Sequence, residues 1–334
     1  MISTDIIIIG AGPCGLFAVF EAGLLKLKCH IIDVLPQIGG QLTEIYPKKP
    51  IYDIPGYPEV LAGELITNLA KQIEPFKPGF TLGERAESIV KQENGKYKVT
   101  TNHDTEIEAP VIVIAGGLGC FEPRKPPIAN IGIYEDHGVD YFIKNPEKYK
   151  GKKIVIAGGG DSALDWSIFL SDLAESIVLV HRTSEFRGAP DSVSKVMDLA
   201  GKGVLQLMTN AQVTALSGDQ QLEQVTITRN DKSQVTKDTD YFIPLFGLTP
   251  KLGPIADWGL LLDQNAIQVN TMDYSTNVPG IYAIGDINTY PGKLKLILCG
   301  FHEATLMCQS AYKYIYPDKK LSFKYTTVTG ITGL

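Results

Sequence analysis

The chain has 334 residues, of which 44% are hydrophobic and 20% charged, a formal net charge of −6 and a mean hydropathy of +0.03. This length leaves room for two domains in an ordinary globular protein. The negative charge balance argues against a nucleic-acid-binding protein, because no general basic field is present to collect phosphates. No apolar span of about 20 residues occurs, so we expect no transmembrane helix, no membrane partner and a cytoplasmic location.

A glycine-rich motif follows the first apolar run, Ile6 to Ile9, and we call it the first fingerprint. Glycines at such a place let a pyrophosphate lie against bare backbone at a helix N-terminus. The acid Asp33 closes the next apolar stretch, where a carboxylate accepts hydrogen bonds from ribose hydroxyls and repels a 2′-phosphate. The site therefore suits FAD or NAD. The motif residues are Gly10, Ala11, Gly12, Pro13, Cys14 and Gly15.

A second glycine-rich motif, the second fingerprint, follows the apolar run 153–157. His181 and Arg182 close its next strand, and 181 − 158 equals 33 − 10, so His181 and Asp33 are expected at the same place in two copies of one βαβ unit. A basic cluster there favours a 2′-phosphate, and Arg187 can supply a second planar fork for it. The second site therefore suits NADPH. The motif residues are Gly158, Gly159, Gly160, Asp161, Ser162 and Ala163.

The five cysteines contain no C-x-x-C pair, which indicates reduced thiols in a reducing compartment. Cys14 stands at an expected helix N-terminus that could acidify its thiol, but packing beside the nucleotide is the favoured role. Cys299 and His302 form a C-x-x-H pair without two further ligands, so no metal site is expected.

Two further apolar segments complete the outline, residues 110–119 and 280–287, each running into glycine. They predict an α/β protein with two Rossmann-like FAD/NAD(P)-binding domains. A discontinuous FAD-binding domain is expected over residues 1–115 and 247–334, with a C-terminal extension at 313–334. An NADPH-binding domain is expected over residues 116–246.

Several short motifs occur along the chain: GAGPCG (10–15), GGQL (39–42), IYPKKPIYD (45–53), IPGYP (54–58), GGGDSA (158–163), HRTSEFR (181–187), GDI (285–287) and FKYTT (323–327). Together they resemble the thioredoxin-reductase-like fold over nearly the whole chain. Those enzymes normally carry a C-x-x-C, whereas residues 119–124 read GCFEPR here. The retained scaffold, the missing dithiol and the added tail make the chain similar to ferredoxin–NADP reductases of the thioredoxin-reductase type.

This resemblance implies hydride transfer from NADPH to flavin N5, followed by single-electron transfers to ferredoxin or flavodoxin, in a homodimer. It places Tyr46 on one face of the flavin and Tyr325 over the other, with Thr326 and Thr327 near N5. It also implies that Asp286 holds the ribityl chain at the start of the last helix. The other FAD positions that it implies are Asp33, Gln41, Ala86, Phe121 and Ile287.

Three questions stay open at this point. Tyr52 is a rival for flavin stacking, although a core tyrosine is the favoured interpretation. A thiol-disulfide reductase is a poor alternative, because electrons from FAD need a vicinal dithiol relay. An NADPH-sensing flavoprotein regulator without physiological turnover is the alternative from another class.

Overall fold

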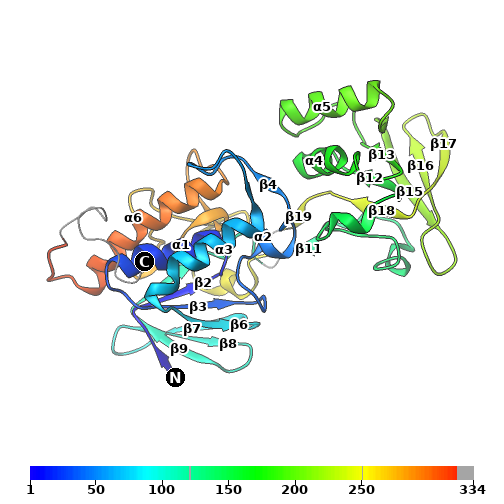
Figure 1. The fold of residues 1–334 in the computed structure, drawn as a ribbon. Helices are drawn as coiled ribbons and strands as arrows, with labels where there is room; N and C mark the ends of the chain where they lie inside the picture. Colours follow the sequence, from blue (N-terminus) through cyan, green and yellow to red (C-terminus); the bar gives the residue numbers. More distant parts are fainter. Residues whose placement is uncertain (120–121, 250, 322–334) are drawn as a thin grey trace. The chain divides into compact units, whose positions relative to one another are not determined.

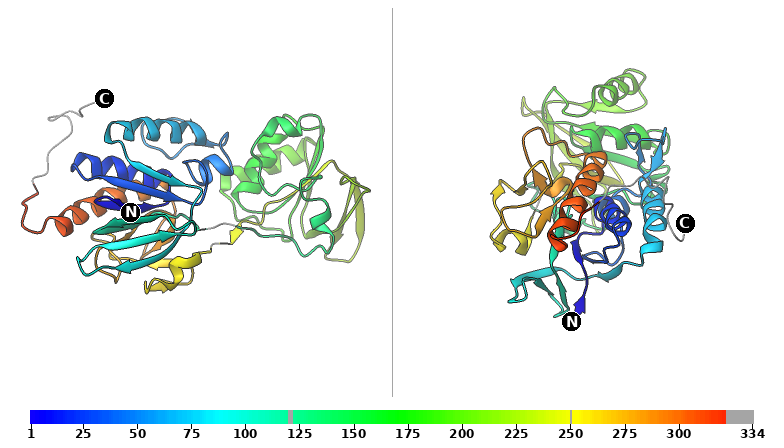
Figure 2. Two further views of the ribbon diagram at one scale, coloured as in Figure 1. Left: turned by 90° about the horizontal axis from the view of Figure 1, so that it is seen from below. Right: turned by 90° about the vertical axis from the view of Figure 1, so that its left-hand side faces the viewer.

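The computed structural model describes residues 1–119, 122–249 and 251–321. The chain divides into two compact units: the first unit is Met1–Cys120 with Pro250–Leu334, and the second unit is Phe121–Thr249. The divisions fall at residues 120 and 249, where the sequence suggested 115 and 246. Figures 1 and 2 show the chain leaving the first unit and returning to it.

The first unit is built on a five-stranded parallel sheet whose two faces are both covered. Its strand order is β22 (Ile281–Ala283), β10 (Val111–Ile114), β2 (Ile6–Ile9), β3 (Cys29–Asp33), β6 (Gly79–Leu82). Helices α1 (Pro13–Leu24), α3 (Ala62–Ile73) and α6 (Ile297–Ile315) cover one face, and the antiparallel strands β7 (Ala86–Lys91), β8 (Tyr97–Thr101) and β9 (Glu106–Ala109) cover the other (Figure 1). Double coverage explains why β2 and β10 are apolar at every position.

Successive residues of β2 serve the two cores in turn. Ile6 and Ile8 pack among the helices, while Ile7 and Ile9 pack toward β8 and β9. This alternation is the two-residue period of a strand. Residues 106–114 do not form one strand, because Pro110 has no N–H for the ladder, and β9 and β10 on either side of it belong to different sheets.

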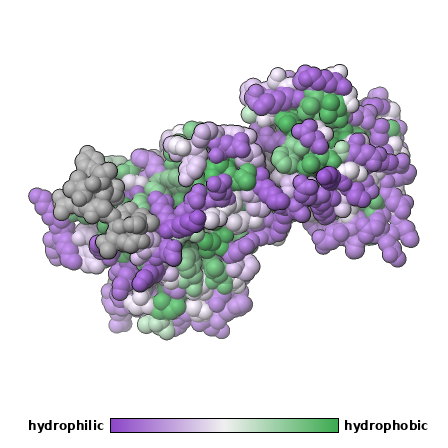
Figure 3. Space-filling model, in the orientation of Figure 1, coloured by the Kyte–Doolittle hydropathy of each residue, from purple (hydrophilic) through white to green (hydrophobic). Residues whose placement is uncertain are grey.

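The second unit repeats the plan on a smaller scale. Its parallel sheet has the order β14 (Gln206–Met208), β13 (Ser176–Val180), β12 (Lys153–Ala157), β18 (Tyr241–Pro244). Helices α4 (Asp161–Leu170) and α5 (Pro190–Gly201) lie on one side of it, and the antiparallel strands β15 (Ala211–Ser217), β16 (Gln224–Arg229) and β17 (Gln234–Asp238) pack on the other. Hydrophobic surface shows in Figure 3 where α4 and α5 lie, and Phe169 of α4 and Met197 of α5 are both exposed.

The two fingerprints occupy equivalent places, as their spacing predicted. Ile9 pairs with Ile32 in the first unit and Ala157 with Val180 in the second. The next N–H on each first strand, from Gly10 and from Gly158, donates to the carbonyl of Ile32 and of Val180, respectively. Asp33 and His181 therefore stand one step past matched positions in two βαβ units.

Shorter elements connect these layers. The short strands are β1 (Ile2–Ser3), β4 (Pro50–Ile51), β5 (Val60–Leu61), β11 (Glu122–Pro123), β19 (Leu248–Thr249), β20 (Leu262–Asp263), β21 (Ala266–Gln268) and β23 (Asn288–Thr289), and the short helices are α2 (Gln41–Glu44), η1 (Glu74–Phe76), η2 (Ile131–Ile133), η3 (Pro146–Tyr149), η4 (Gly253–Asp257) and η5 (Gly285–Ile287). Since α6 runs to Ile315, the first three residues of the expected extension at 313–334 are helical. Among the described residues, no helix has the length and apolar character needed to cross a membrane.

Candidate functional site

The first fingerprint forms the turn between β2 and α1. Gly12 precedes the helix in an extended conformation, no side chain caps α1, and its first turn holds no acid. The N–H groups at that end are therefore left for another partner. A Cβ at Gly12 would meet nothing within 4 Å, whereas one at Gly15 would overlap the carbonyl oxygen of Gly10. The turn thus combines a close strand-to-helix approach with open space before the helix, which fits a pyrophosphate.

Asp33 at the end of β3 holds this turn in place. The N–H of Ala11 donates to its Oδ2 (2.6 Å) and the N–H of Leu35 to its Oδ1 (2.8 Å). Burial raises the pKa of Asp33, and these two backbone donors counteract the rise. A carboxylate oxygen accepts more than one hydrogen bond, so both oxygens keep capacity for ribose hydroxyls.

The loop after β3 closes over the same turn. The N–H of Gly39 donates to the carbonyl of Ala11 (2.8 Å). Gly40 has a φ of 58°, and a Cβ there would lie 3.4 Å from Gly12 Cα. Gln41 then begins α2, and its Nε2 would be 3.7 Å from a Cβ on Gly117, just beyond β10. The expected FAD residue Gln41 therefore lies close to the carboxyl end of the sheet.

The Gly-Asp motif after β22 lies near Tyr46. Burial and then the charge of Asp286 raise the pKa of Tyr46 to about 12. Burial also raises the pKa of Asp286 itself, which Lys293 and Lys295 counteract. The expectation that Asp286 begins the last helix is wrong: it lies with Ile287 in the short helix η5, and α6 begins only at Ile297.

The separation between Asp286 and α6 has a local cause. Residues 288–289 form the strand β23, and the segment that follows contains Pro291 and then Gly292 at a φ of 82°. Neither the strand nor the left-handed glycine is compatible with a continuing helix.

Cys14 packs where α1 meets η5 and α6. A Cβ on Gly285 would lie 3.1 Å from its Sγ, and one on Gly300 would overlap that sulfur. Burial, followed by the charges of Asp286 and Glu303, raises the pKa of Cys14 to about 12. Burial thus outweighs any acidification by the helix dipole, and the thiol acts as a packing group.

The structure describes two of the other residues that the sequence associated with the flavin, Ala86 and Tyr52. Ala86 is buried at the start of β7, in the core beneath the central sheet. Tyr52 is 66% exposed, so its interpretation as a core tyrosine is wrong. The remaining expected positions, Phe121, Tyr325, Thr326 and Thr327, lie outside the described residues.

The second fingerprint forms the corresponding turn between β12 and α4. Gly160 precedes the helix in an extended conformation, and a Cβ there would meet nothing within 4 Å. Asp161 begins α4, but its Oδ1 accepts a hydrogen bond from the N–H of Ala189 (2.7 Å). The N–H of Arg187 donates to the carbonyl of Gly159 (2.7 Å). Two hydrogen bonds therefore hold the loop that follows β13 against the fingerprint, beside the exposed Ser162.

His181 contributes a buried, packed ring to this site. Its ring stacks on Phe186 with centroids 4.9 Å apart, and its Nε2 lies 2.9 Å from Thr183 Oγ1. A Cβ on Gly159 would overlap the ring. Burial lowers the pKa of His181, and the neighbouring arginines lower it further. The expected basic cluster is therefore formed by Arg182 and Arg187, which are both exposed.

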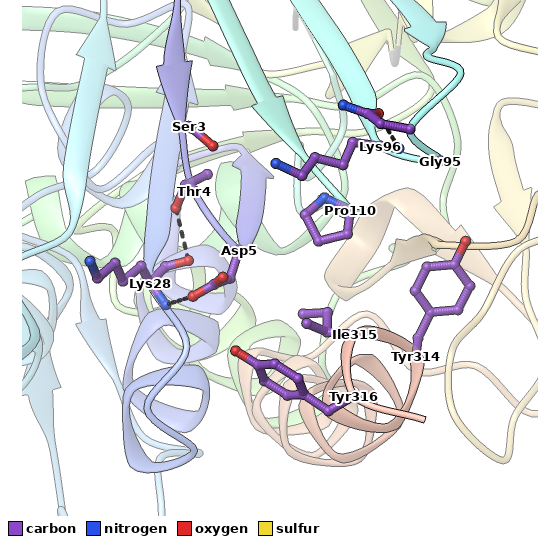
Figure 4. Close-up of a pocket in the computed structure, with 11 residues that line it drawn as sticks. Ser3, Thr4, Asp5, Lys28, Gly95, Lys96, Pro110, Tyr314, Ile315 and Tyr316 are labelled. Atoms are coloured by element: carbon purple, nitrogen blue, oxygen red, sulfur yellow. Dashed lines mark hydrogen bonds between the residues drawn. The ribbon is translucent and has the colours of Figure 1, made fainter. Parts of the chain in front are cut away.

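A cavity of about 590 Å³ lies elsewhere in the first unit, between the end of α6 and the N-terminal segment. Figure 4 shows Tyr314 and Tyr316 on one side and Asp5 near Lys28 on the other. The N–H of Lys28 donates to Asp5 Oδ2 (2.8 Å). None of the expected site residues lines this cavity. In the described part of the chain, no group of three His, Cys, Asp or Glu residues could hold a metal ion.

Comparisons with known proteins agree with this geometry. The family of pyridine nucleotide-disulphide oxidoreductases matches residues 4–304. The chain is 67% identical over 336 residues to ferredoxin–NADP reductase 1 of Christiangramia forsetii (100% of this chain, 95% of the relative) and 52% identical over 327 residues to ferredoxin–NADP reductase of Bradyrhizobium sp. (98% and 95%).

Solved structures have the same fold at low sequence identity. The thioredoxin reductase of T. acidophilum aligns with a TM-score of 0.81 at 24% identity, covering 94% of this chain and 99% of that one. The predicted fold class, two Rossmann-like domains of the thioredoxin-reductase-like type, is confirmed. The chain belongs to the pyridine nucleotide-disulphide oxidoreductase family, within its ferredoxin–NADP reductases.

Proposed function

We propose that this protein transfers electrons between NADPH and ferredoxin through bound FAD. One observation carries the proposal: two matched fingerprints of opposite character, with Asp33 beyond the first and Arg182 and Arg187 beyond the second, in a sequence without a C-x-x-C pair. Bound FAD supplies the redox chemistry, because it accepts two electrons as a hydride and gives them up singly. Reductases 52–67% identical to this chain carry the same activity in their names.

The residues of each unit have defined tasks in this proposal. In the first unit, which we assign as the FAD-binding domain, Gly12 leaves room for the pyrophosphate and Asp33 accepts the ribose hydroxyls. Tyr46 stacks on the flavin and Asp286 holds the ribityl chain. Tyr325, Thr326, Thr327 and Phe121 complete the flavin surroundings. In the second unit, which we assign as the NADPH-binding domain, the arginines bind the 2′-phosphate while Gly158, Gly160 and Ser162 line the pyrophosphate.

An assay with three acceptors tests the function. Purified protein loaded with FAD is given NADPH and, in parallel, ferredoxin, flavodoxin or thioredoxin. We expect rapid reduction of ferredoxin, followed through cytochrome c, and none of thioredoxin. Reduction of flavodoxin in the same assay would show that the protein also uses a second electron carrier. Tight NADPH binding without reduction of any acceptor would contradict the proposal and favour the sensor.

A second prediction separates this enzyme from a thiol-disulfide reductase. Replacing all five cysteines by serine or alanine should leave NADPH-driven ferredoxin reduction within about twofold of wild type, because no thiol relay is required. Cys14 is replaced by alanine, since its buried sulfur sits against Gly285 and Gly300. Flavin content is measured by absorbance to normalise the rates. Loss of activity at normal flavin content would show that a thiol takes part.

Docking of an acidic carrier to a net negative protein must depend on local basic groups. Three basic clusters lie in sequence beside expected flavin neighbours: Lys48 with Lys49, Arg124 with Lys125, and Lys319 with Lys320 and Lys324. Lys125 pairs with Glu135, whereas Lys319 Nζ lies 3.8 Å from the centroid of the Tyr316 ring. We test the third cluster. Reversing two of its charges, Lys319→Glu/Lys320→Glu, should lower the rate of ferredoxin reduction severalfold at low salt and flatten its salt dependence.

The control variant Lys71→Glu/Lys77→Glu changes the net charge equally at two exposed lysines near the end of α3. It should behave as wild type. Equal effects of both variants across a salt series would rule out a local patch.

We also propose a homodimer in the cytoplasm. Light scattering of the holoprotein, together with fractionation of cells producing a tagged chain, tests these two points. A monomeric holoprotein would contradict the first and a membrane-bound pool the second.

A further inference from the structure

Glu303 of α6 is a fully buried carboxylate with four hydrogen-bond donors. Its partners are the N–H of Gly285, the side-chain amide of Asn288, the hydroxyl of Tyr290 and the ammonium of Lys293. A buried charge is tolerated when it is paired and its lone pairs are satisfied. Lys293, whose side chain is only 6% exposed, supplies the opposite charge.

One oxygen of this carboxylate holds both ends of the turn that carries Asp286. Glu303 Oε2 accepts the N–H of Gly285 (2.7 Å) before Asp286 and Asn288 Nδ2 (2.8 Å) after it. Gly285 has a φ of 76°, so the turn begins in a conformation that few other residues adopt. A single acceptor on α6 thus holds the backbone N–H just before Asp286 and a side-chain amide two residues after it.

Asn288 strengthens this hold. Its Nδ2 also donates to the carbonyl of Ala283 (2.9 Å), and since both partners are acceptors, the orientation of the amide is determined. Its Oδ1 is buried without a partner among the described residues. The amide thus makes two hydrogen bonds through Nδ2 while its Oδ1 stays unsatisfied, which indicates that holding the turn in place outweighs the free-energy cost of that buried oxygen.

The other oxygen of Glu303 has two side-chain donors. Glu303 Oε1 accepts the hydroxyl of Tyr290 (2.9 Å) and the Lys293 ammonium. The two oxygens therefore have different partners: Oε2 binds the turn that carries Asp286, and Oε1 pairs with the Lys293 ammonium.

We infer that Glu303 is a positioning residue for FAD: it fixes residues 285–288 so that Asp286 is presented to the ribityl chain. The inference rests on the proposed FAD function. Neither Glu303 nor Lys293 was expected from the sequence, because their pairing depends on how α6 packs against η5. A merely structural ion pair would also be buried here, so the experiment must separate stability from affinity.

Apoprotein variants separate these two roles. In the variant Lys293→Met/Glu303→Leu, apolar side chains of similar volume replace the pair, so that neither charge is left buried without its partner. We expect the unfolding midpoint of its apoprotein to fall, because the N–H of Gly285 and the hydroxyl of Tyr290 lose their acceptor, so FAD affinity is measured well below that midpoint. We expect its Kd for FAD, measured by fluorescence titration, to rise about 10- to 100-fold, because the turn loses an acceptor for two donors.

Two further variants keep the acceptor. Tyr290→Phe removes a donor to Oε1 only, and should leave the Kd within about twofold of wild type. Lys293→Met/Glu303→Gln keeps one side-chain oxygen for Gly285 and Asn288 without a charge, and should bind FAD more tightly than the leucine variant. If the leucine variant is unstable, the Kd values of the glutamine variant and of Tyr290→Phe are compared instead. Because both keep an acceptor for Gly285 and Asn288, we expect both to bind FAD, and loss of FAD binding in the folded Tyr290→Phe protein would contradict the assignment of the anchoring role to Oε2.

Wild-type affinity in the leucine variant would overturn the inference, as would equal losses in the leucine and glutamine variants. Failure of wild-type apoprotein to bind FAD would instead overturn the proposed function.

Discussion

Replacing Gly12 by alanine is expected to abolish tight FAD binding while the apoprotein stays folded. The added Cβ meets nothing within 4 Å, and the backbone there is extended, so the fold accommodates it at a cost below about 1 kcal/mol. The methyl group would occupy the space in which the proposed pyrophosphate approaches the start of α1. Losing two charge-assisted hydrogen bonds of about 1.5–3 kcal/mol each corresponds to at least about a 100-fold rise in the Kd for FAD.

Gly15→Ala is the matched comparison in the same motif. Its Cβ would overlap the carbonyl oxygen of Gly10, so the turn itself must move, at about 1–3 kcal/mol or more. Urea unfolding of the two apoproteins and FAD titration distinguish the cases. A Gly12→Ala protein that holds FAD as tightly as wild type would show that the pyrophosphate does not lie at this helix end.

Replacing Arg182 or Arg187 by alanine is expected to raise the KM for NADPH about 10- to 100-fold and to leave the KM for NADH unchanged. Each guanidinium is exposed beside the second fingerprint, and each lost charge-assisted hydrogen bond to a phosphate is worth about 1.5–3 kcal/mol. Steady-state reduction of ferricyanide with either cofactor measures the effect. Arg229→Ala, an exposed arginine on β16 of the same unit, is the control.

His181→Ala should behave differently from either arginine variant. The ring is buried against Phe186 and Gly159, so its removal loosens the loop and should weaken NADPH and NADH alike. Equal losses with both cofactors in the arginine variants would instead mean that the arginines do not read the 2′-phosphate.

The sequence predicted the parts of the site that are local along the chain. An apolar strand, a glycine turn and a helix form one continuous segment, so the spacing of Gly10 to Asp33 and of Gly158 to His181 was enough to place equivalent residues. The burial of His181 could not be predicted, because it comes from the packing of Phe186 and Gly159 against its ring.

Features that depend on distant packing could not be predicted in the same way. Glu303 meets Gly285 only because α6 lies along η5, and no spacing rule links residues 18 positions apart in a loop and a helix. The start of α6 was predictable in principle, since Pro291 and Gly292 interrupt the segment after Asp286. Tyr52 shows the limit of residue type as a guide, because an aromatic side chain in a loop is exposed as easily as buried.

The buried thiols have a consequence for chemical durability. Oxidation of cysteine begins from the thiolate, so sulfenic acid forms slowly where the thiol stays protonated. Burial raises the pKa of Cys14 to about 12 and raises those of Cys29 and Cys308 as well. These three sulfurs should therefore resist peroxide, so that exposure to peroxide leaves the packing around α1 and α6 unchanged.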